Sequence, residues 1–572
     1  MRYSELVDIY EKLEATSSKL GKTGIIADVL KAAPAELLPK LVMLFYGTVF
    51  PPWSEEKIGV ADKMMIRAVA KAVGMKESEV VASYRKTGDL GLSAEQLIAK
   101  KRQKRLAARA LDVNKVFDTI QKIARQTGAG SQESKTALIV ELLSVAQPKE
   151  AKYIVRTVLE QLRMGVAEGI VRDAIAKAFG IDTDIVESAW YVRPDYGEVA
   201  KIAKERGVAG LKKIELVIGM PIMVQLAEKA PDLKSAVEAF KRPVLEYKYD
   251  GARIAVHKKG DKFWLYTRRL ENVTEAFPDV VETCKKALMA KECIVEGEAL
   301  AIDPKTKRPQ PFQRLSQRIK RKYDIAKVAK EIPVNLHVFD IVYLNGRTLF
   351  DKSLEERFNI LKKTVKPIAD KIEFARRLIP KDLKEAEAFY KKALSEGQEG
   401  LIVKNLDALY TPGRRVAGGW LKVKPVMETL DLAIIGATWG TGKRAGWLGS
   451  LILGIRDPET GKFLECGMLG TGIKEKKTRA EDVTFEDMTK MLKPYIISQS
   501  GHDVKIKPKI IIEVAYEEIQ KSPTYSSGFA LRFPRFIRLR PDKGPAEADD
   551  LNRIKALFEI QKGKAPAETG EK

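Results

Sequence analysis

Residues 245–253 read Leu-Glu-Tyr-Lys-Tyr-Asp-Gly-Ala-Arg, and this short stretch guides the interpretation of the whole chain. On a β-strand, successive side chains point to opposite faces, so Glu246, Lys248 and Asp250 share one face. A glycine then permits a tight change of direction before Arg253. A lysine flanked by acids can be an ordinary ion pair on a solvated strand. It can also be a nucleophile that attacks the α-phosphate of a nucleotide.

Covalent catalysis by a lysine requires that its amine lose a proton, because an ordinary lysine is protonated at neutral pH. Adjacent acids oppose that loss, whereas metal ions and arginines favour it. If Lys248 is a nucleophile, we therefore expect Mg²⁺ or Mn²⁺ and several basic side chains around it.

Further polar residues of the required kinds follow Lys248 along the chain. They include an arginine after the next strand, acids suited to metal or ribose, an aromatic ring suited to stacking on a base, and lysines suited to phosphate charge. In chain order these residues are Arg268, Glu298, Phe339, Glu399, Lys404 and Lys422. Glu296 shares the strand face of Glu298, and Lys424 shares that of Lys422.

The composition indicates a globular protein with a polyanionic partner. The formal net charge is +24, with 45% hydrophobic and 31% charged residues. Such a surplus favours binding to nucleic acid, and an anionic membrane surface is the weaker alternative. The sequence has no apolar run of about 18 residues and no signal peptide, so we expect neither a membrane span nor secretion.

Cysteines and histidines number three each, which limits the possible chemistry. No cysteines form a CxxC pair, so we expect a reducing, cytoplasmic setting without a zinc ribbon or disulfide framework. So few histidines also disfavour a Ser–His–Asp arrangement or a multi-histidine zinc site.

The 572 residues divide by pattern into three domains and a tail. Residues 1–216 show helical spacing of apolar residues, including the stretch 151–179, and predict an all-α domain. Residues 217–427 alternate short strands with helices and predict an α+β domain with one main sheet. Residues 428–558 contain short strands with glycine turns and predict a β-barrel of the OB type. Residues 559–572 form a polar tail.

The motifs together resemble a known enzyme family. KYDGAR (248–253) resembles the adenylation motif of ATP-dependent DNA ligases, and the later motifs follow in the order of the covalent nucleotidyltransferase superfamily. Residues 163–179 are similar to the helical DNA-binding domain of archaeal and eukaryotic replicative ligases. Residues 435–449 and 531–543 are similar to their OB domain. The resemblance implies an enzyme that seals nicks in duplex DNA through a lysyl-AMP and a DNA-adenylate.

The same resemblance implies roles for the nucleotide-binding residues. Lys248 would carry AMP, Glu246 would face the adenine amino group, and Phe339 would stack on the base. Arg253 and Arg268 would hold phosphate or sugar oxygens.

The other implied roles concern metal and phosphate. Glu298 would contact the ribose and help organise the metal, with Glu399 as the second acid near it. Lys404 and Lys422 would contact the α-phosphate. Arg540 and Lys543 would orient the pyrophosphate of ATP when the OB domain closes.

One position departs from the family pattern. The arginine expected four residues before Trp420 is replaced by Val416, so either Arg415 or Arg414 would take its role. We assign Arg415 to the nucleotide site and leave Arg414 as the alternative.

Several other functions are alternatives to a DNA ligase. An RNA ligase or a capping guanylyltransferase shares the lysine motif but is not expected to carry such a helical domain. An NAD-dependent ligase should have a four-cysteine zinc site, and a non-enzymatic DNA-binding scaffold would not need the ordered motifs. We expect ATP as the nucleotide, nicked duplex DNA as the partner, a monomer, and a location at the nucleoid. The basic run 101–110 is either a solvated helix face or a phosphate contact. A sliding clamp stays an open partner, because residues 103–107 lack paired aromatics.

Overall fold

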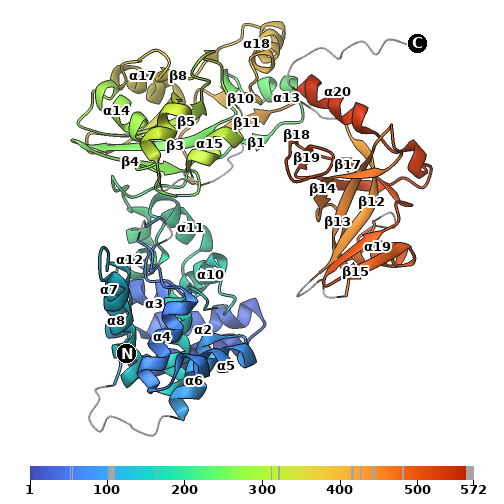
Figure 1. Ribbon diagram of the computed structural model, residues 1–572. Coiled ribbons are helices and arrows are strands. Elements are labelled where there is room, and N and C mark those ends of the chain that lie inside the picture. The colour runs from blue at the N-terminus through green and yellow to red at the C-terminus, as the bar shows by residue number, and fades with distance from the viewer. Residues whose placement is uncertain are drawn as a thin grey trace. The chain divides into compact units, whose positions relative to one another are not determined.

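The structure is a computed structural model, and it describes residues 1–51, 53–54, 56–100, 110–162, 164–310, 312–319, 323–413, 418–425, 428–440, 444, 446–479 and 482–561. The chain forms two compact units, whose elements are labelled in Figure 1. The first unit comprises residues 1–228, 251–375 and 405–420. The second comprises residues 229–250, 376–404 and 421–572. Each unit is described by itself.

The N-terminal part of the first unit is all helical, as the sequence predicted. Its helices are α1 (Tyr3–Ala15), α2 (Lys19–Ala32), α3 (Leu38–Phe45), α4 (Asp62–Val73), α5 (Glu77–Thr87), α6 (Leu90–Ala99), α7 (Val113–Ala124), α8 (Ser131–Val145), α9 (Pro148–Val158), α10 (Glu168–Phe179), α11 (Thr183–Val192) and α12 (Tyr196–Lys212). Helix α7 begins at the cap residue Asp112, whose carboxylate accepts a hydrogen bond from the Lys115 amide. Its buried residues recur at three- and four-residue spacing and join one large apolar core.

The helical pattern predicted over 151–179 is interrupted. Helix α9 ends at Val158 and α10 begins at Glu168. Gly165, in the connection, has a φ of 64°, a left-handed conformation that does not fit a regular right-handed helix. The apolar spacing continues across this break, which is why the pattern alone did not reveal it.

A buried ion cluster ties helices of this part together. The Lys152 amine lies 2.8 Å from a Glu11 carboxylate oxygen and 2.9 Å from one of Glu14. The Arg156 guanidinium lies 3.0 Å from Glu14 and 2.9 Å from Asp89. Both cations are buried, so removing a carboxylate would leave buried charge without full compensation.

We expect the ion cluster to make stability depend on acid pH. Burial opposes ionisation of Glu11, but Lys152 and Tyr153 outweigh it and lower the pKa of Glu11 to about 2. A carboxylate with a depressed folded-state pKa stabilises the fold above its unfolded pKa of about 4.3, and that contribution is lost as pH falls towards 2. The Tm of Glu11→Gln should therefore lie below that of the wild type at pH 7.

The gap between the two Tm values should shrink as pH falls from about 5 to about 2. Glu205→Gln, at an exposed position of α12, serves as the control and should leave Tm unchanged. A gap of constant size across this pH range would rule out the proposed contribution of Glu11.

A six-stranded sheet forms the rest of the first unit. Its strand order is β4-β3-β5-β6-β7, and β8 pairs in parallel with β6. The strands are β3 (Ala252–Lys259), β4 (Lys262–Thr267), β5 (Glu292–Ala301), β6 (Val334–Leu344), β7 (Arg347–Thr348) and β8 (Ile372–Phe374). The helices are α14 (Pro278–Ala287), α15 (Phe312–Ile319), α16 (Ile325–Glu331) and α17 (Leu354–Thr364). Apolar residues of one sheet face, such as Ile254 and Val295, share a core with Cys284 and Leu315 of these helices. Alternation then places Arg253 and Glu296 on the opposite face.

The second unit contains a separate five-stranded sheet of order β1-β11-β10-β2-β9. Its strands are β1 (Glu228–Lys229), β2 (Pro243–Lys248), β9 (Arg377–Leu378), β10 (Gly400–Asn405) and β11 (Trp420–Val423), with helices α13 (Leu233–Glu238) and α18 (Leu383–Ser395). The prediction of one main sheet over 217–427 was therefore wrong, because local alternation identifies strands but not their hydrogen-bond partners. The chain leaves one sheet for the other at Gly251, where an added Cβ would lie 2.5 Å from the Ala299 carbonyl oxygen.

The C-terminal part of the second unit is mainly antiparallel β-structure, in agreement with the predicted class. A seven-stranded sheet contains the path β14-β13-β12-β16-β15, with β17 pairing with β12 and β20, and β18 and β19 form a hairpin. The strands are β12 (Leu430–Trp439), β13 (Leu448–Arg456), β14 (Phe463–Leu469), β15 (Ile496–Ser500), β16 (Asp503–Ile506), β17 (Ile511–Ala515), β18 (Glu518–Lys521), β19 (Phe529–Arg532) and β20 (Arg535–Leu539). Helices α19 (Phe485–Leu492) and α20 (Leu551–Gln561) share its apolar core. This strand set is compatible with an OB fold, although no closing pair joins its edges among the described strands.

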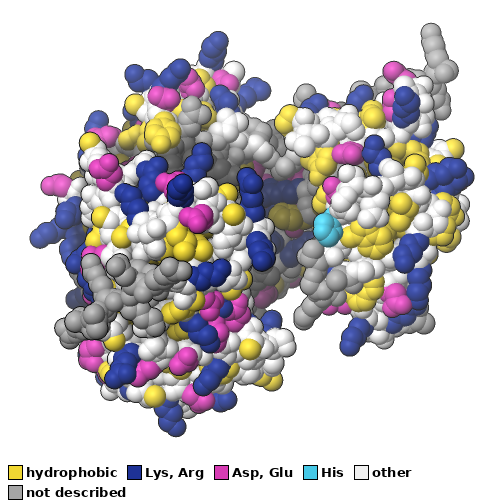
Figure 2. Space-filling view, turned by 60° about the horizontal axis from the view of Figure 1, so that its bottom comes forward, with side chains coloured by type: hydrophobic (Ala, Val, Ile, Leu, Met, Phe, Trp, Pro, Cys, Tyr) yellow, Lys and Arg dark blue, Asp and Glu magenta, His cyan; other side chains and the backbone are white. Residues whose placement is uncertain are grey.

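Lys and Arg side chains are spread over the visible surface and intermixed with acidic ones (Figure 2). None of the helices in the described ranges is both long enough and apolar enough to cross a membrane. Most of the basic run 101–110, for which a solvated helix face or a phosphate contact was expected, lies outside the described residues.

Candidate active site

Lys248 ends β2, beside the start of β10. Its amine lies 2.5 Å from a carboxylate oxygen of Glu399, and the Lys424 amine lies 2.6 Å from the same oxygen. The Glu399 amide donates a hydrogen bond of 2.9 Å to the Lys248 carbonyl oxygen, so backbone and side chain both join the two residues. Gly400 follows with a φ of 139°, and an added Cβ there would overlap the Val423 carbonyl oxygen. Two lysines and one acid are thereby gathered at the ends of three neighbouring strands.

The Glu399 carboxylate stays ionised at neutral pH. Burial opposes its ionisation, but the charges of Lys248 and Lys424 lower the pKa of Glu399 to about 2. The Lys248 side chain is 21% exposed. The nucleophile candidate is therefore half-buried and paired with Glu399.

Glu246 lies on the same strand and is almost fully buried. Its carboxylate accepts a hydrogen bond of 2.9 Å from Arg377 Nε and forms an ion pair with Lys404. Burial opposes the ionisation of Glu246, but these two cations outweigh it and keep its pKa below the usual range. Tyr247, which lies between Glu246 and Lys248 on β2, packs against Phe389 of α18. This contact confirms the predicted alternation of β2.

A second cluster, in the first unit, surrounds Arg253 on β3. One terminal nitrogen of Arg253 lies 2.7 Å from Glu296, and the other donates a hydrogen bond of 2.7 Å to the Gln225 carbonyl oxygen. The guanidinium lies 5.2 Å from the ring centroid of Phe339 and 5.1 Å from that of Trp420. These two rings meet edge to face at 6.0 Å. Arg253 is thus held by an acid, a backbone carbonyl and two aromatic rings.

The remaining predicted residues fall at several places in the fold. Glu298, half-buried on β5, is the antiparallel partner of Arg253 on β3. Arg268 is exposed in the turn after β4, and Lys422 is half-buried on β11. Arg415 and its alternative Arg414 lie outside the described residues.

Arg540 and Lys543 follow β20 and share one acidic partner. The carboxylate of Asp431, on β12, lies 2.6 Å from an Arg540 nitrogen and 2.7 Å from the Lys543 amine. Asp542 also pairs with Arg540, at 2.7 Å. Both predicted pyrophosphate ligands are therefore held by carboxylates of their own unit.

Sequence reasoning did not assign four residues that the structure places in these clusters. Lys424 was recognised only as a neighbour of Lys422, and Glu296 only as the companion of Glu298, although alternation supplied a signal for both. Arg377 and Tyr410 carried no signal, because they contact Glu246 and Glu296 from distant points in the chain.

The acids in these clusters could supply part of the ligand set of a magnesium ion. Mg²⁺ is usually bound through one or two carboxylates together with phosphate oxygens and water. Glu399 offers an ionised carboxylate beside Lys248 in the second unit, and Glu298 is a carboxylate of the first unit. In the described ranges, no three acidic, histidine or cysteine side chains gather into a complete metal site. Glu399 could therefore be one protein ligand of a metal that is held mainly by substrate phosphates and water.

Comparison with known proteins identifies the family. The description "DNA ligase N terminus" matches residues 2–176, "ATP dependent DNA ligase domain" matches 224–424, and "ATP dependent DNA ligase C terminal region" matches 444–543. The DNA ligase of Nanoarchaeum equitans (strain Kin4-M) is 50% identical, with 98% of this chain and 99% of the relative covered. The DNA ligase of Thermococcus onnurineus (strain NA1) is 46% identical, with 98% of each chain covered.

The fold comparison agrees with the sequence matches. A solved structure described as "Pmar-Lig_Pre." has a TM-score of 0.52 at 18% identity, with 94% of this chain and 99% of that chain covered. A lysine paired with acid and cation at a strand end is an arrangement suited to covalent nucleotide transfer. The chain belongs to the ATP-dependent DNA ligase family. It is an enzyme that uses ATP to join DNA, and nicked DNA is its substrate.

Proposed function

We propose that Lys248 carries AMP between ATP and the nick. The cluster of Lys248, Glu399 and Lys424 is the observation that supports this role best. It places the amine at the end of β2, beside a second cation. A neighbouring positive charge favours the neutral amine, whereas Glu399 favours the charged one. Attack on the α-phosphate therefore requires that Lys248 leaves Glu399 while cations compensate the charge of the ATP phosphates.

The proposed reaction has three transfers in which bonds and charges balance. The Lys248 amine forms a P–N bond to the α-phosphorus, the P–O bond to pyrophosphate breaks, and the amine gives up a proton. A 5′-phosphate oxygen of the nick then takes AMP from Lys248, which regains its proton. The 3′-hydroxyl oxygen finally attacks the 5′-phosphorus, its proton passes to solvent, and the P–O bond to AMP breaks as the strand is sealed. Each transfer needs positioning and neutralised phosphate charge.

We assign the nucleotide contacts as the sequence predicted. Glu246 faces the adenine amino group. Each carboxylate oxygen can accept two hydrogen bonds, so one oxygen of Glu246 is shared between the base and a cation. Phe339 stacks on the base. Arg253 and Arg268 hold sugar or phosphate oxygens, and Arg415 belongs to the same set.

The phosphate contacts and the metal complete the proposal. Lys404 and Lys422 contact the α-phosphate, with Lys424 added to them. Glu298 and Glu399 hold Mg²⁺ or Mn²⁺, which supplies positive charge for the phosphate oxygens.

The proposal also covers the domain bounds, the oligomeric state, the location and the mode of DNA binding. The functional domains are 1–216, 217–427 and 428–558, with a tail at 559–572. The protein acts as a monomer at the nucleoid in the cytoplasm. A sliding clamp stays an open partner. DNA binding uses phosphates and shape in place of base edges, so affinity should fall steeply with salt.

We expect AMP to be found on a single lysine. After incubation with ATP and Mg²⁺, proteolysis and mass spectrometry should locate the adduct on the peptide that contains Lys248. The peptide with Lys422 and Lys424 should carry none and serves as the internal control. AMP on any other lysine would overturn the assignment of the nucleophile while leaving the ligase activity in place.

A further inference from the structure

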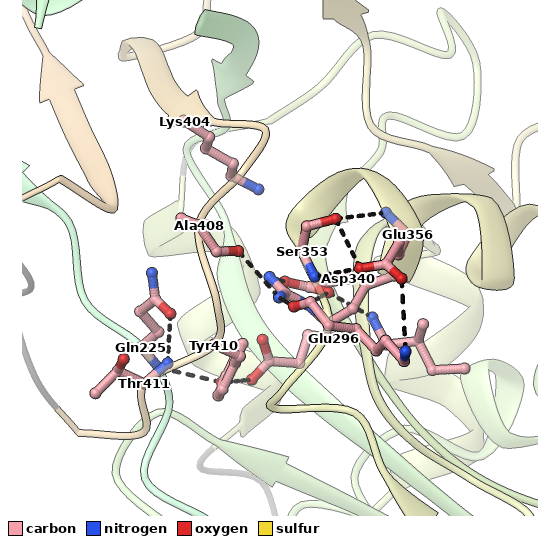
Figure 3. A network of polar contacts seen from close by, with 12 residues as sticks. Gln225, Glu296, Asp340, Ser353, Glu356, Lys404, Ala408, Tyr410 and Thr411 are labelled. Atoms are coloured by element: carbon pink, nitrogen blue, oxygen red, sulfur yellow. Dashed lines mark hydrogen bonds and ion pairs between the residues drawn. The ribbon is translucent and has the colours of Figure 1, made fainter. Parts of the chain in front are cut away.

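Tyr410 and Glu296 belong to a polar network of the first unit (Figure 3), and Glu296 also pairs with Arg253. The Tyr410 hydroxyl donates a hydrogen bond of 2.8 Å to a Glu296 carboxylate oxygen and accepts one of 3.1 Å from the Gln225 amide. Burial and the adjacent Glu296 charge raise the pKa of Tyr410, so the hydroxyl keeps its proton and remains a donor. The other Glu296 oxygen pairs with Arg253. One carboxylate therefore joins Tyr410 to Arg253.

The segment around Gln225 closes the network on its other side. The Gln225 side-chain oxygen accepts a hydrogen bond of 2.8 Å from the Thr411 amide, and its carbonyl oxygen accepts one of 2.7 Å from Arg253. Tyr410 and Thr411 thus fix both the acid and the carbonyl that hold the guanidinium. Gln225 and Glu296, which lie far apart in the sequence, each hold one terminal nitrogen of Arg253.

The ring of Tyr410 is itself fixed from two sides. Phe350 stacks on it, with centroids 5.3 Å apart and planes 14° apart. The Arg357 guanidinium lies 5.4 Å from the centroid and forms a fully buried ion pair with Asp340 at 2.8 Å. Ser353 and Glu356 form the capping box of α17, the helix that carries Arg357 (Figure 3). These contacts restrict the ring of Tyr410, and therefore its hydroxyl, to one position.

The Nε of Arg253 is a donor that a ligand could satisfy. It is buried and has no hydrogen-bond partner among the residues that the structure describes. Buried donors are normally satisfied, so such a group in a candidate site points to a ligand. Tyr410 contacts the two groups that hold the terminal nitrogens, Glu296 and the Gln225 segment. It can therefore orient the guanidinium without contacting the ligand.

We propose that Tyr410 is a positioning residue for the nucleotide, acting through Glu296 to orient the Arg253 guanidinium. The inference rests on the proposed contact of Arg253 with nucleotide oxygens. Tyr410 itself touches no substrate atom. An arginine fixed before binding loses less side-chain freedom when ATP arrives, so the network lowers the entropic cost of holding the nucleotide.

The test uses Tyr410→Phe in the full chain, with the rate of lysyl-AMP formation measured against ATP concentration. This variant keeps the stacking ring and removes only the hydroxyl. The KM for ATP should rise by roughly tenfold, the scale for losing one hydrogen bond to a charged group, and the maximal rate should change little. Tyr343→Phe is the matched control, because its hydroxyl lies 3.3 Å from the partly exposed Glu292 on the same strand pair. Its KM should equal that of the wild type.

A double-mutant cycle separates this inference from the role of Arg253. Arg253→Ala should raise the KM for ATP, and adding Tyr410→Phe to it should raise the KM no further. An unchanged KM in Arg253→Ala would overturn the nucleotide contact itself. A raised KM in Arg253→Ala with a normal KM in Tyr410→Phe would overturn only the inference about Tyr410. A full Tyr410→Phe effect in the Arg253→Ala background would also overturn it.

Glu296→Gln provides a second variant if Tyr410→Phe does not fold. It keeps an acceptor for Tyr410 but removes the charge that holds Arg253. It should raise the KM for ATP, and its far-UV circular dichroism should match that of the wild type. A folded Glu296→Gln protein with a normal KM would contradict the proposed path through the carboxylate.

Discussion

Lys248→Ala should abolish lysyl-AMP formation and, with it, sealing of ordinary nicks from ATP. The proposed first step forms a P–N bond to this amine, and the structure places no other lysine at the end of β2. Removal of a nucleophile in covalent catalysis costs on the order of 10⁶-fold in rate, so the residual activity should be undetectable in a standard assay. The measurement is the rate of adduct formation with labelled ATP, followed by the rate of nick sealing.

The same variant should still seal a nick whose 5′ end already carries AMP. The last transfer uses the 3′-hydroxyl and the DNA-adenylate, and it forms no bond to Lys248. Lys259→Ala is a suitable control, because Lys259 ends β3 and pairs with Glu292 at 3.9 Å on an exposed surface. It should form the adduct at the wild-type rate. Normal sealing of ordinary nicks by Lys248→Ala would exclude the covalent account.

Lys543→Ala should slow adduct formation by roughly 100-fold, the scale typical for losing one charged group that stabilises a transition state. In the structure the Lys543 amine and Arg540 both pair with Asp431, so both must leave this carboxylate before they can reach pyrophosphate. Sealing of pre-adenylated nicks should be nearly unaffected, because pyrophosphate takes part only in the first transfer. The two rates are measured separately on the same preparation.

Lys490→Ala is the matched control for Lys543→Ala. Lys490 lies on α19 of the same domain and pairs with Glu486 at 2.8 Å, mostly exposed to solvent. Its removal changes the net charge equally but should leave both rates unchanged. If Lys543→Ala slowed the two steps equally, its proposed role in orienting pyrophosphate would be wrong.

The fold class could be predicted from the sequence because each domain repeats a distinct local pattern. Three- and four-residue spacing identified the helical part, and short strands with glycine turns identified the C-terminal part. The number of sheets in the middle could not be read in this way. Strands β2 and β3 are separated by three residues, yet they belong to different sheets, and only their hydrogen-bond partners reveal it.

The candidate site was predictable where the chemistry lies within one strand. Alternation grouped Glu246 with Lys248, and their positions on β2 agree with that grouping. The partners of these residues come from elsewhere. Arg377 reaches Glu246 from a two-residue strand, and Tyr410 reaches Glu296 from a loop. Such contacts depend on tertiary packing, for which a single sequence carries no periodic signal.

The most direct measurement follows a label from ATP to the nick. The purified protein is incubated with Mg²⁺ and ATP labelled in its adenylate, with labelled GTP and NAD in parallel, and the washed adduct is then mixed with nicked duplex DNA. We predict label on the wild-type protein from ATP, none on Lys248→Ala, and release of the label as AMP when the nick is sealed. Label that stays on the protein while nicks are sealed, or an unlabelled protein that seals them with ATP, would contradict the account.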